Sequence, residues 1–337
     1  MIATQPTKKE LSLGFLGVGW IGRNRMEAIL NHTNAKAAAI TEPNPENSDE
    51  ALKSAKNAIL KTSAEELFSE EDLDGIVIAT PSAMHAEQSM QALRSGKAVF
   101  CQKPLGRTAE EVRQVVQASR ESDKLLAVDL SYRYTKAFKA VYDTIQKGEI
   151  GDIYAVDLKF HNAYGPDKEW FYDIKRSGGG CVMDLGIHLV DLALWSLNFP
   201  EIKDVRSHLF HKGQKLTSFE EHVEDFASVS LTSEKNQVIN LECSWHVSAG
   251  KDAIIEATFY GTKGGASFRN INGSFYDFKA EKYNGTQTET LVNTPDEWSG
   301  RAGIVWVENM IKNNRFDEKS ATEFIKTAEV IDRIYGR

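Results

Sequence analysis

Short apolar runs alternate with helix-forming stretches along the first 130 residues of this chain. Nearly continuous apolar strands of this kind, each followed by a helix, are typical of a parallel sheet covered on both faces. The predicted strands are the run ending before Gly17 and residues 37–40, 76–79, 98–101 and 125–128. The predicted helices are 23–30, 49–59, 63–68 and 85–94, and one that Thr108 caps. The pattern therefore predicts a doubly wound α/β domain over residues 1–130.

Past residue 130 the pattern changes to alternating strands with few helices between them. Such alternation, broken by turns, indicates a mostly antiparallel sheet. The predicted strands are 154–160, 225–232, 237–245, 254–260, 265–268 and 273–279, and the predicted helices are 137–146, 183–195 and 319–334. Residues 131–337 are therefore expected to form a second, α+β domain.

The first strand ends in Gly17-Val-Gly19-Trp20-Ile21-Gly22, a G-x-G-x-x-G turn that leads into a helix. These glycines permit a tight turn, close approach of a pyrophosphate to the backbone, and close packing of the helix on the sheet. Glu42 follows the next apolar run, 20 residues after Gly22. A carboxylate at that spacing reaches a ribose diol and repels a 2′-phosphate. No arginine occurs in the Pro-Asn-Pro segment that follows, so we expect NAD in preference to NADP.

The net charge of the chain limits the kinds of partner that it is expected to bind. The net charge is −8 over 337 residues, and the pI is near 5.6, which argues against nucleic acid or an anionic membrane as the main partner. No apolar run reaches the length of a membrane span. The three cysteines have no C-x-x-C spacing, which fits a cytoplasmic protein and predicts no metal site.

Two further strand ends carry candidate chemistry. Thr80-Pro81 follows the strand 76–79, and His85 stands at the start of the next helix. Because ligands of open α/β sheets bind beyond the carboxyl ends of strands, this turn should lie along the cofactor. His85 is either a cofactor contact or an ordinary polar residue of a helix start. Gln102-Lys103-Pro104 follows the strand 98–101, where Lys103 either meets a substrate oxygen or is a surface lysine.

The segment 178–195 holds a glycine run followed by an apolar helix with one polar stripe. Asp184, His188, Asp191 and Trp195 stand at i, i+4, i+7 and i+11, and nearly everything else there is apolar. A helix apolar on almost all sides is buried, so its polar stripe should face a partner or a cleft. A histidine beside a carboxylate suits proton transfer. A structural Asp–His pair and half of a metal site are the alternatives.

On these residues the chain resembles the NAD(P)-dependent sugar and inositol oxidoreductases that include glucose–fructose oxidoreductase and myo-inositol dehydrogenase. The resemblance is specific over residues 11–200 and generic after that. It implies a Rossmann domain and an α/β domain whose open sheet mediates a homodimer or homotetramer. It also implies hydride transfer between a nicotinamide and a hydroxyl-bearing ring carbon of a small-molecule sugar or polyol. One departure is plain, since the family's usual Glu-Lys-Pro reads Gln102-Lys103-Pro104 here.

The resemblance assigns roles to the matching residues. His188 would take the hydroxyl proton, Lys103 would hydrogen-bond the alkoxide, and Asp184 would orient His188, so these three are the expected catalytic residues. The expected cofactor contacts are Gly17, Gly19, Trp20, Ile21, Gly22, Glu42, Thr80, Pro81, His85, Gln102 and Lys103. The expected substrate contacts are Arg133, His161, Tyr164, Trp170, Asp184 and His188.

Other interpretations stay open at this stage. Trp170 and Tyr172 fit a core or interface as well as a sugar platform, and Lys175-Arg176 would fit a phosphorylated sugar. The same residues would serve an NAD-dependent glycosidase or lyase that oxidises its sugar only transiently. A non-catalytic NAD-binding regulator is the third possibility, which Gln102 in place of a glutamate makes conceivable.

Overall fold

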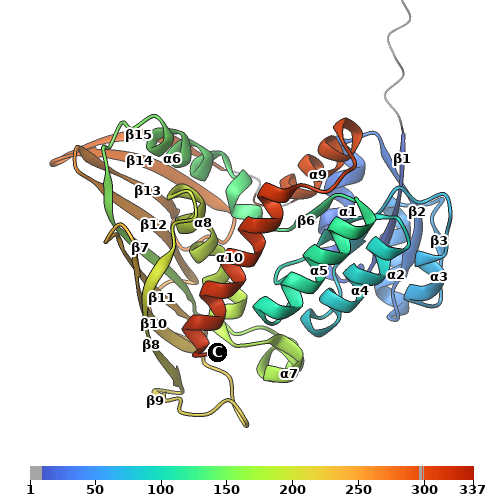
Figure 1. Cartoon of the computed structure of the whole chain (residues 1–337), viewed down its shortest axis with the longest axis horizontal. Helices are drawn as coiled ribbons and strands as arrows, with labels where there is room; N and C mark the ends of the chain where they lie inside the picture. The colour runs from blue at the N-terminus through green and yellow to red at the C-terminus, as the bar shows by residue number, and fades with distance from the viewer. Residues whose placement is uncertain (1–9, 296–297, 299) are drawn as a thin grey trace, which may run out of the picture.

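The computed structural model describes residues 10–295, 298 and 300–337, which form two sheets with helices between and around them (Figure 1). The first sheet is parallel and has the order β3-β2-β1-β4-β5-β6. Its strands are β1 (Leu11–Leu16), β2 (Ala35–Thr41), β3 (Ile59–Leu60), β4 (Gly75–Ile78), β5 (Ala98–Cys101) and β6 (Leu126–Val128). The order reverses between β1 and β4, and ligands bind beyond the strand ends at such a reversal.

The helices of this domain are α1 (Trp20–His32), α2 (Pro45–Ser54), α3 (Ala64–Phe68), α4 (Ser82–Arg94) and α5 (Ala109–Ser122). Two of them, α3 and α5, begin at the side-chain caps that the sequence predicts. Ser63 and Thr108 accept from the backbone N–H groups of Glu66 and Glu111, as expected of capping residues. Helix α2 starts four residues earlier than predicted, because Asn44 caps it and Pro45 occupies its first position.

The second sheet has nine strands in the order β15-β14-β13-β12-β7-β11-β10-β8-β9. All neighbours pair antiparallel except β7 and β11, so the expected mostly antiparallel sheet is confirmed. Its strands are β7 (Ile153–Asn162), β8 (Ile202–His211), β9 (Gln214–Lys215), β10 (Phe226–Ser233), β11 (Val238–Ser244), β12 (Ala253–Gly261), β13 (Gly264–Asn270), β14 (Asp277–Asn284) and β15 (Gln287–Pro295). Strands β8, β9 and β15 were not predicted from the sequence.

Among the residues that the structure describes, helices cover one face of this sheet and none packs on the other (Figure 1). The covering helices are α6 (Lys136–Gln146), α8 (Ile187–Ser196) and α10 (Glu318–Tyr335), and the short turns are η1 (Ser131–Tyr134), η2 (Glu169–Tyr172), α7 (Ile174–Ser177) and the π-helical η3 (Val182–Gly186). Among the described residues, the stretch Ile174–Ser196 is long and apolar enough to cross a membrane by length and composition alone. Its most apolar 18-residue segment is, however, 94% buried within the protein. This helix is therefore the core of the second domain.

The C-terminal residues tie the two domains together. Helix α9 (Arg301–Lys312) belongs to the predicted second domain by sequence but packs on the first sheet. Trp306 is 1% exposed, lies 5.7 Å from Phe100 between ring centroids, and contacts the backbone of Gly75 so closely that a Cβ there would collide with it. The domain boundary at 130/131 stays a prediction. Helix α9 follows that boundary in the sequence but packs with the first domain.

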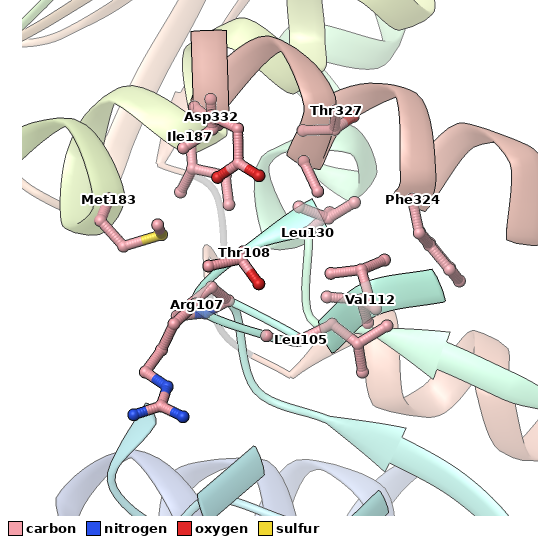
Figure 2. A pocket seen from close by; sticks show the side chains of 15 residues that line it. Leu105, Arg107, Thr108, Val112, Leu130, Met183, Ile187, Phe324, Thr327 and Asp332 are labelled. Atoms are coloured by element: carbon pink, nitrogen blue, oxygen red, sulfur yellow. The ribbon is translucent and has the colours of Figure 1, made fainter. Parts of the chain in front are cut away.

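Helix α10 fills the space between the domains. It meets the loop after β5 and helix α8 around a small apolar pocket of about 30 Å³, which Leu105, Val112, Leu130, Ile187 and Phe324 help to line (Figure 2). That volume holds about one or two water molecules. Asp332 on α10 also accepts from the backbone N–H of Ala109 at 2.8 Å and so caps α5. The junction between the domains is therefore closely packed here.

We predict that Trp306→Ala lowers the free energy of unfolding by about 3–5 kcal/mol, because it empties a packed site between α9 and the first sheet. Chemical denaturation of both proteins measures the difference. Glu308→Ala, on the exposed side of the same helix, is the matched control and should change stability by less than about 0.5 kcal/mol. Equal stability of the Trp306→Ala variant and the wild type would contradict this packing.

Candidate active site

A cavity of about 1040 Å³ opens between the carboxyl ends of the first sheet and the inner side of the second domain. Both domains line it, which is where the reversal between β1 and β4 places a ligand. The predicted site residues that line it are Gly17, Gly19, Trp20, Ile21, Glu42, Thr80, Pro81, His85, Gln102, Lys103, Trp170, Asp184 and His188. Gly22, Arg133, His161 and Tyr164 are not among the lining residues.

The glycine turn has the geometry that its sequence predicts. Gly17 has φ = +83°, and a Cβ there would come within 2.7 Å of the carbonyl oxygen of Ala79. A Cβ on Gly22 would collide with the carbonyl oxygen of Gly17. Glu42 accepts from the N–H of Val18 at 2.8 Å through Oε2 and from the N–H of Asn44 at 3.0 Å through Oε1. The carboxylate is thereby fixed at the rim of the turn.

His85 connects two loops of the cavity wall. Its Nδ1 lies 2.7 Å from the carbonyl oxygen of Pro104, and its Nε2 lies 2.7 Å from that of Thr80. The side chain is 2% exposed and sits one turn inside α4, which begins at Ser82. His85 is therefore not an ordinary polar residue of a helix start, because its ring joins the loop after β4 to the loop that carries Lys103.

Lys103 and Asp184 form an ion pair across the two domains. The ammonium of Lys103 donates to Oδ1 of Asp184 at 2.7 Å and to the backbone carbonyl of the same residue at 2.6 Å. The indole N–H of Trp245, at the end of β11, donates to Oδ2 at 3.1 Å. Trp245 was missed from the sequence, where it ends a predicted strand without any motif around it.

This geometry corrects one expectation. Asp184 was predicted to orient His188, but its carboxylate is held by Lys103 and Trp245 instead. The physical reason is that a cation, delivered by the loop after β5, competes successfully for the carboxylate against an uncharged ring. Spacing along one helix cannot reveal a partner that comes from another domain.

His188 lies in the cavity wall as a buried, uncharged ring. It is 6% exposed, its Nδ1 has no hydrogen-bond partner among the described residues, and Tyr132 packs edge-on against it at 5.0 Å between centroids. Burial, helped by the nearby cations Lys103 and Arg25, lowers the pKa of His188 well below its usual value. At neutral pH this imidazole is therefore uncharged.

A second ion pair lies in the wall on the first domain's side. Arg25 on α1 donates from Nε to Oδ2 of Asp129 at 2.5 Å, and Gln102 donates its side-chain amide to the same oxygen at 2.5 Å. Arg25 and Asp129 are 1% and 0% exposed. Sequence reasoning missed both, because neither belongs to a recognisable motif.

The predicted polar stripe divides into two parts. Arg133, expected to contact substrate or cofactor, instead pairs with Asp191 at 2.5 Å and Glu323 at 2.6 Å and packs over the ring of Trp195. This buried cluster joins η1, α8 and α10. Asp191 and Trp195 therefore do not line the cavity. Both contact Arg133 instead, because a buried guanidinium needs a close partner of opposite charge.

Two other expected substrate contacts also have partners elsewhere. His161 lies 2.8 Å from the Ser244 hydroxyl through Nδ1, and burial lowers its pKa. Tyr164 is 56% exposed and donates to Asp252 at 2.6 Å. Among the described residues no three His, Cys, Asp or Glu side chains are arranged to hold a metal ion.

Comparison with known proteins identifies the family. Residues 11–130 match the profile of an oxidoreductase family with an NAD-binding Rossmann fold, and residues 138–267 match the C-terminal domain of the same GFO/IDH/MocA family. The chain belongs to the Gfo/Idh/MocA oxidoreductase family. The two matches lie on either side of η1, where the first sheet ends.

The chain is similar to the 1,5-anhydro-D-fructose reductase of Ensifer adhaerens, with 32% identity over 189 residues covering 55% of this chain and 56% of that one. It spans a little over half the length of the first curated Gfo/Idh/MocA relatives that it matches. Among solved structures it is similar to levoglucosan dehydrogenase in complex with NADH, with a TM-score of 0.82, 20% identity, and coverage of 97% and 96% of the two chains. It is equally similar to a 3-ketoreductase of Actinomadura kijaniata in complex with NADP, with a TM-score of 0.82, 17% identity, and coverage of 97% and 98%.

We predict that His188 makes the protein less stable in acid. Because its pKa is lowered in the folded state, the unfolded chain binds a proton first as the pH falls below about 6.5, and stability is lost from there downward. The pH dependence of the free energy of unfolding, compared between the wild type and His188→Gln, measures this loss. His208→Gln, at an exposed position, is the control and should track the wild type. Parallel curves for wild type and His188→Gln would refute the assignment.

Proposed function

We propose that this protein is an NAD-dependent oxidoreductase that transfers a hydride between a nicotinamide and a hydroxyl-bearing ring carbon of an uncharged sugar or polyol. One observation carries the proposal. A lysine paired with Asp184 and a neutral histidine line the same wall of a cavity that begins at a dinucleotide-binding turn. That arrangement supports a reaction in which one group donates a hydrogen bond to the substrate oxygen and the other accepts its proton.

Each residue of the site has its own role in this reaction. When bound, the nicotinamide supplies the hydride acceptor or donor. Lys103 donates a hydrogen bond to the substrate oxygen and stabilises the negative charge that develops there. His188 accepts the hydroxyl proton in the direction of oxidation and returns it in the direction of reduction. Asp184 and Trp245 hold the ammonium of Lys103 in place rather than acting on His188.

The charges around the cavity favour an uncharged substrate. Within the described part of the chain, the Lys and Arg residues that line it are each paired with a carboxylate: Arg25 with Asp129, Lys103 with Asp184, and Lys168 with Asp167. Lys175 and Arg176, considered from the sequence as a phosphate site, do not line it. Trp170 stacks on Phe171 at 3.8 Å between centroids, and both rings line the cavity, so they offer the apolar faces that sugar rings pack against.

We further propose that NAD is preferred over NADP. Glu42 is held at the rim by two backbone N–H groups, beside Asn44 and Pro43, and it would repel a 2′-phosphate. The expected homodimer or homotetramer would use the face of the nine-stranded sheet opposite the helices, which includes the exposed Tyr260 (Figure 1). A cytoplasmic location is supported by three free cysteines, of which Cys181 and Cys243 have sulfurs only 3.8 Å apart.

The test is growth of NADH absorbance with purified protein, NAD, and a panel of inositols, aldoses, glycosides and sugar phosphates. We expect turnover with an uncharged sugar or polyol, and a drop in kcat/KM of about 10²–10⁴-fold in both Lys103→Met and His188→Gln. Lys175→Met, a surface lysine outside the cavity, is the control for the loss of a charge. Turnover that survives both active-site substitutions would overturn the assigned roles.

A second reaction class would give a different outcome in the same assay. An enzyme that oxidises its sugar only transiently and then eliminates or hydrolyses a substituent shows no net NADH. Chromatography of the sugar products from the same reactions distinguishes that case. NAD binding without change in any sugar would support a regulator and contradict the proposed enzyme.

We predict that replacing Glu42 changes the cofactor. The variant Glu42→Ser with Pro43→Arg removes a repelling carboxylate and adds a cation, so the NADP-to-NAD ratio of kcat/KM should rise roughly tenfold or more. Steady-state kinetics with both cofactors measures the ratio. Glu46→Ser, on the exposed first turn of α2, is the matched control. An unchanged ratio would show that Glu42 does not face the ribose.

A further inference from the structure

The cavity wall beneath Lys103 contains a buried charge cluster that the proposed reaction does not use. We name it the Asp129 cluster, and it consists of Arg25, Gln102, Asp129 and Ser131. Oδ2 of Asp129 accepts from both Arg25 and Gln102 at 2.5 Å, and Oδ1 accepts from the hydroxyl of Ser131 at 2.8 Å. Each member is less than a tenth exposed.

The cluster joins three segments that form the cofactor end of the cavity. Arg25 lies on α1, directly after the glycine turn, and Asp129 follows β6. Gln102 follows β5, and its side-chain oxygen accepts from the backbone N–H of Lys103 at 3.1 Å. The side chain of Gln102 therefore holds Asp129 with its amide N–H and the Lys103 backbone with its oxygen.

The hydrogen bonds of the Asp129 cluster show why Asp129 carries the negative charge and position 102 is neutral. Asp129 is an acceptor at both oxygens, so its neighbour at position 102 must be a donor, and an amide is a donor where an ionised carboxylate is not. The cluster contains one cation and one anion and so balances. A second carboxylate would lie against the first in a buried site, where two like charges are costly.

We propose that Gln102, Asp129 and Arg25 form one positioning unit for Lys103 that accommodates a single carboxylate, which this chain carries at position 129 instead of position 102. Gln102 is thus a working part of the site and not a loss of function. Gln102 and Asp129 are positioning residues, since they act through the loop that presents the Lys103 ammonium to Asp184. The inference rests on the proposed function only where NADH binding is measured.

The groups around position 102 define its response to pH. Arg25 faces it from α1, Asp129 and Ser131 face it from beyond β6, and Lys103 follows it in the chain. Two further titratable groups stay uncharged near neutral pH, because burial raises the pKa of the Cys101 thiol to about 12 and also raises the pKa of Tyr134. A glutamate at position 102 would therefore be governed mainly by Asp129 and Arg25.

The experiment is a charge swap in the full-length protein: Q102E, D129N and the double variant Q102E/D129N, followed by thermal unfolding between pH 5 and pH 9. Q102E keeps the shape of the side chain and should lower the unfolding midpoint by about 5 °C or more at pH 8. Two adjacent carboxylates share a proton, so the folded-state pKa of the pair is raised and stability is lost as the pH rises. The deficit of Q102E should therefore shrink toward pH 5.

The variants D129N and Q102E/D129N complete a double-mutant cycle, which tests whether the two positions depend on each other. D129N leaves the Arg25 cation without its carboxylate and should lower the midpoint at every pH. The double variant restores one cation, one carboxylate and one amide, so its midpoint should exceed that of both single variants. Gln214→Glu, at an exposed position of β9, adds a carboxylate without a buried neighbour and should show no pH-dependent deficit.

Binding of NADH, followed by its fluorescence, provides a readout of positioning that needs no sugar. Each single variant should bind NADH about tenfold more weakly, and the swap should recover much of that loss. Stability losses that simply add in the double variant, or a Q102E protein equal to the wild type at pH 8, would overturn the inference. Failure of the wild type to bind NADH would instead contradict the proposed function, while the unfolding cycle would still decide the charge swap.

Discussion

The ion pair between Lys103 and Asp184 is the contact on which the rest of the site depends. It joins the loop after β5 in the first domain to η3 in the second, at 2.7 Å, with both side chains less than a fifth exposed. A charge this far from water requires a close partner, because leaving either one alone would be costly. The pair therefore fixes how the loop after β5 meets η3 in the cavity wall, a separation on which the proposed hydride transfer would depend.

Other buried charges repeat this principle around the cavity. Arg25 pairs with Asp129 beneath Lys103, and Arg133 pairs with Asp191 and Glu323 behind His188. Each pair links segments far apart in sequence. His188 lies among these paired charges as an uncharged ring, because burial, with the nearby cations Lys103 and Arg25, lowers its pKa.

The departure from Glu-Lys-Pro illustrates how a single substitution depends on its surroundings. In the linear sequence Gln102 removes a charge beside Lys103. In the folded chain Lys103 takes its carboxylate from Asp184, and Gln102 donates to Asp129, 27 residues further along. A buried carboxylate therefore does lie beside Gln102, but it comes from the end of the neighbouring strand β6, and only the folded structure shows it.

Local patterns were enough to predict much of this protein. The glycine turn, Glu42, the capped helices and the strand ends at Thr80 and Lys103 all follow from rules that act over a few residues, such as steric freedom of glycine, capping and apolar periodicity. The partners of Asp184, Asp129 and Arg133 did not follow, nor did the packing of α9 on the first sheet. The ion pairs of Arg25, Lys103 and Arg133 and the packing of α9 join residues 58 to more than 200 positions apart, and a single sequence contains no periodicity that relates them. The sequence alone predicted the glycine turn and the strand ends that present the candidate residues, because these depend on local rules. Only the tertiary structure showed which charge meets which, because a buried ion pairs with the opposite charge that the fold brings next to it.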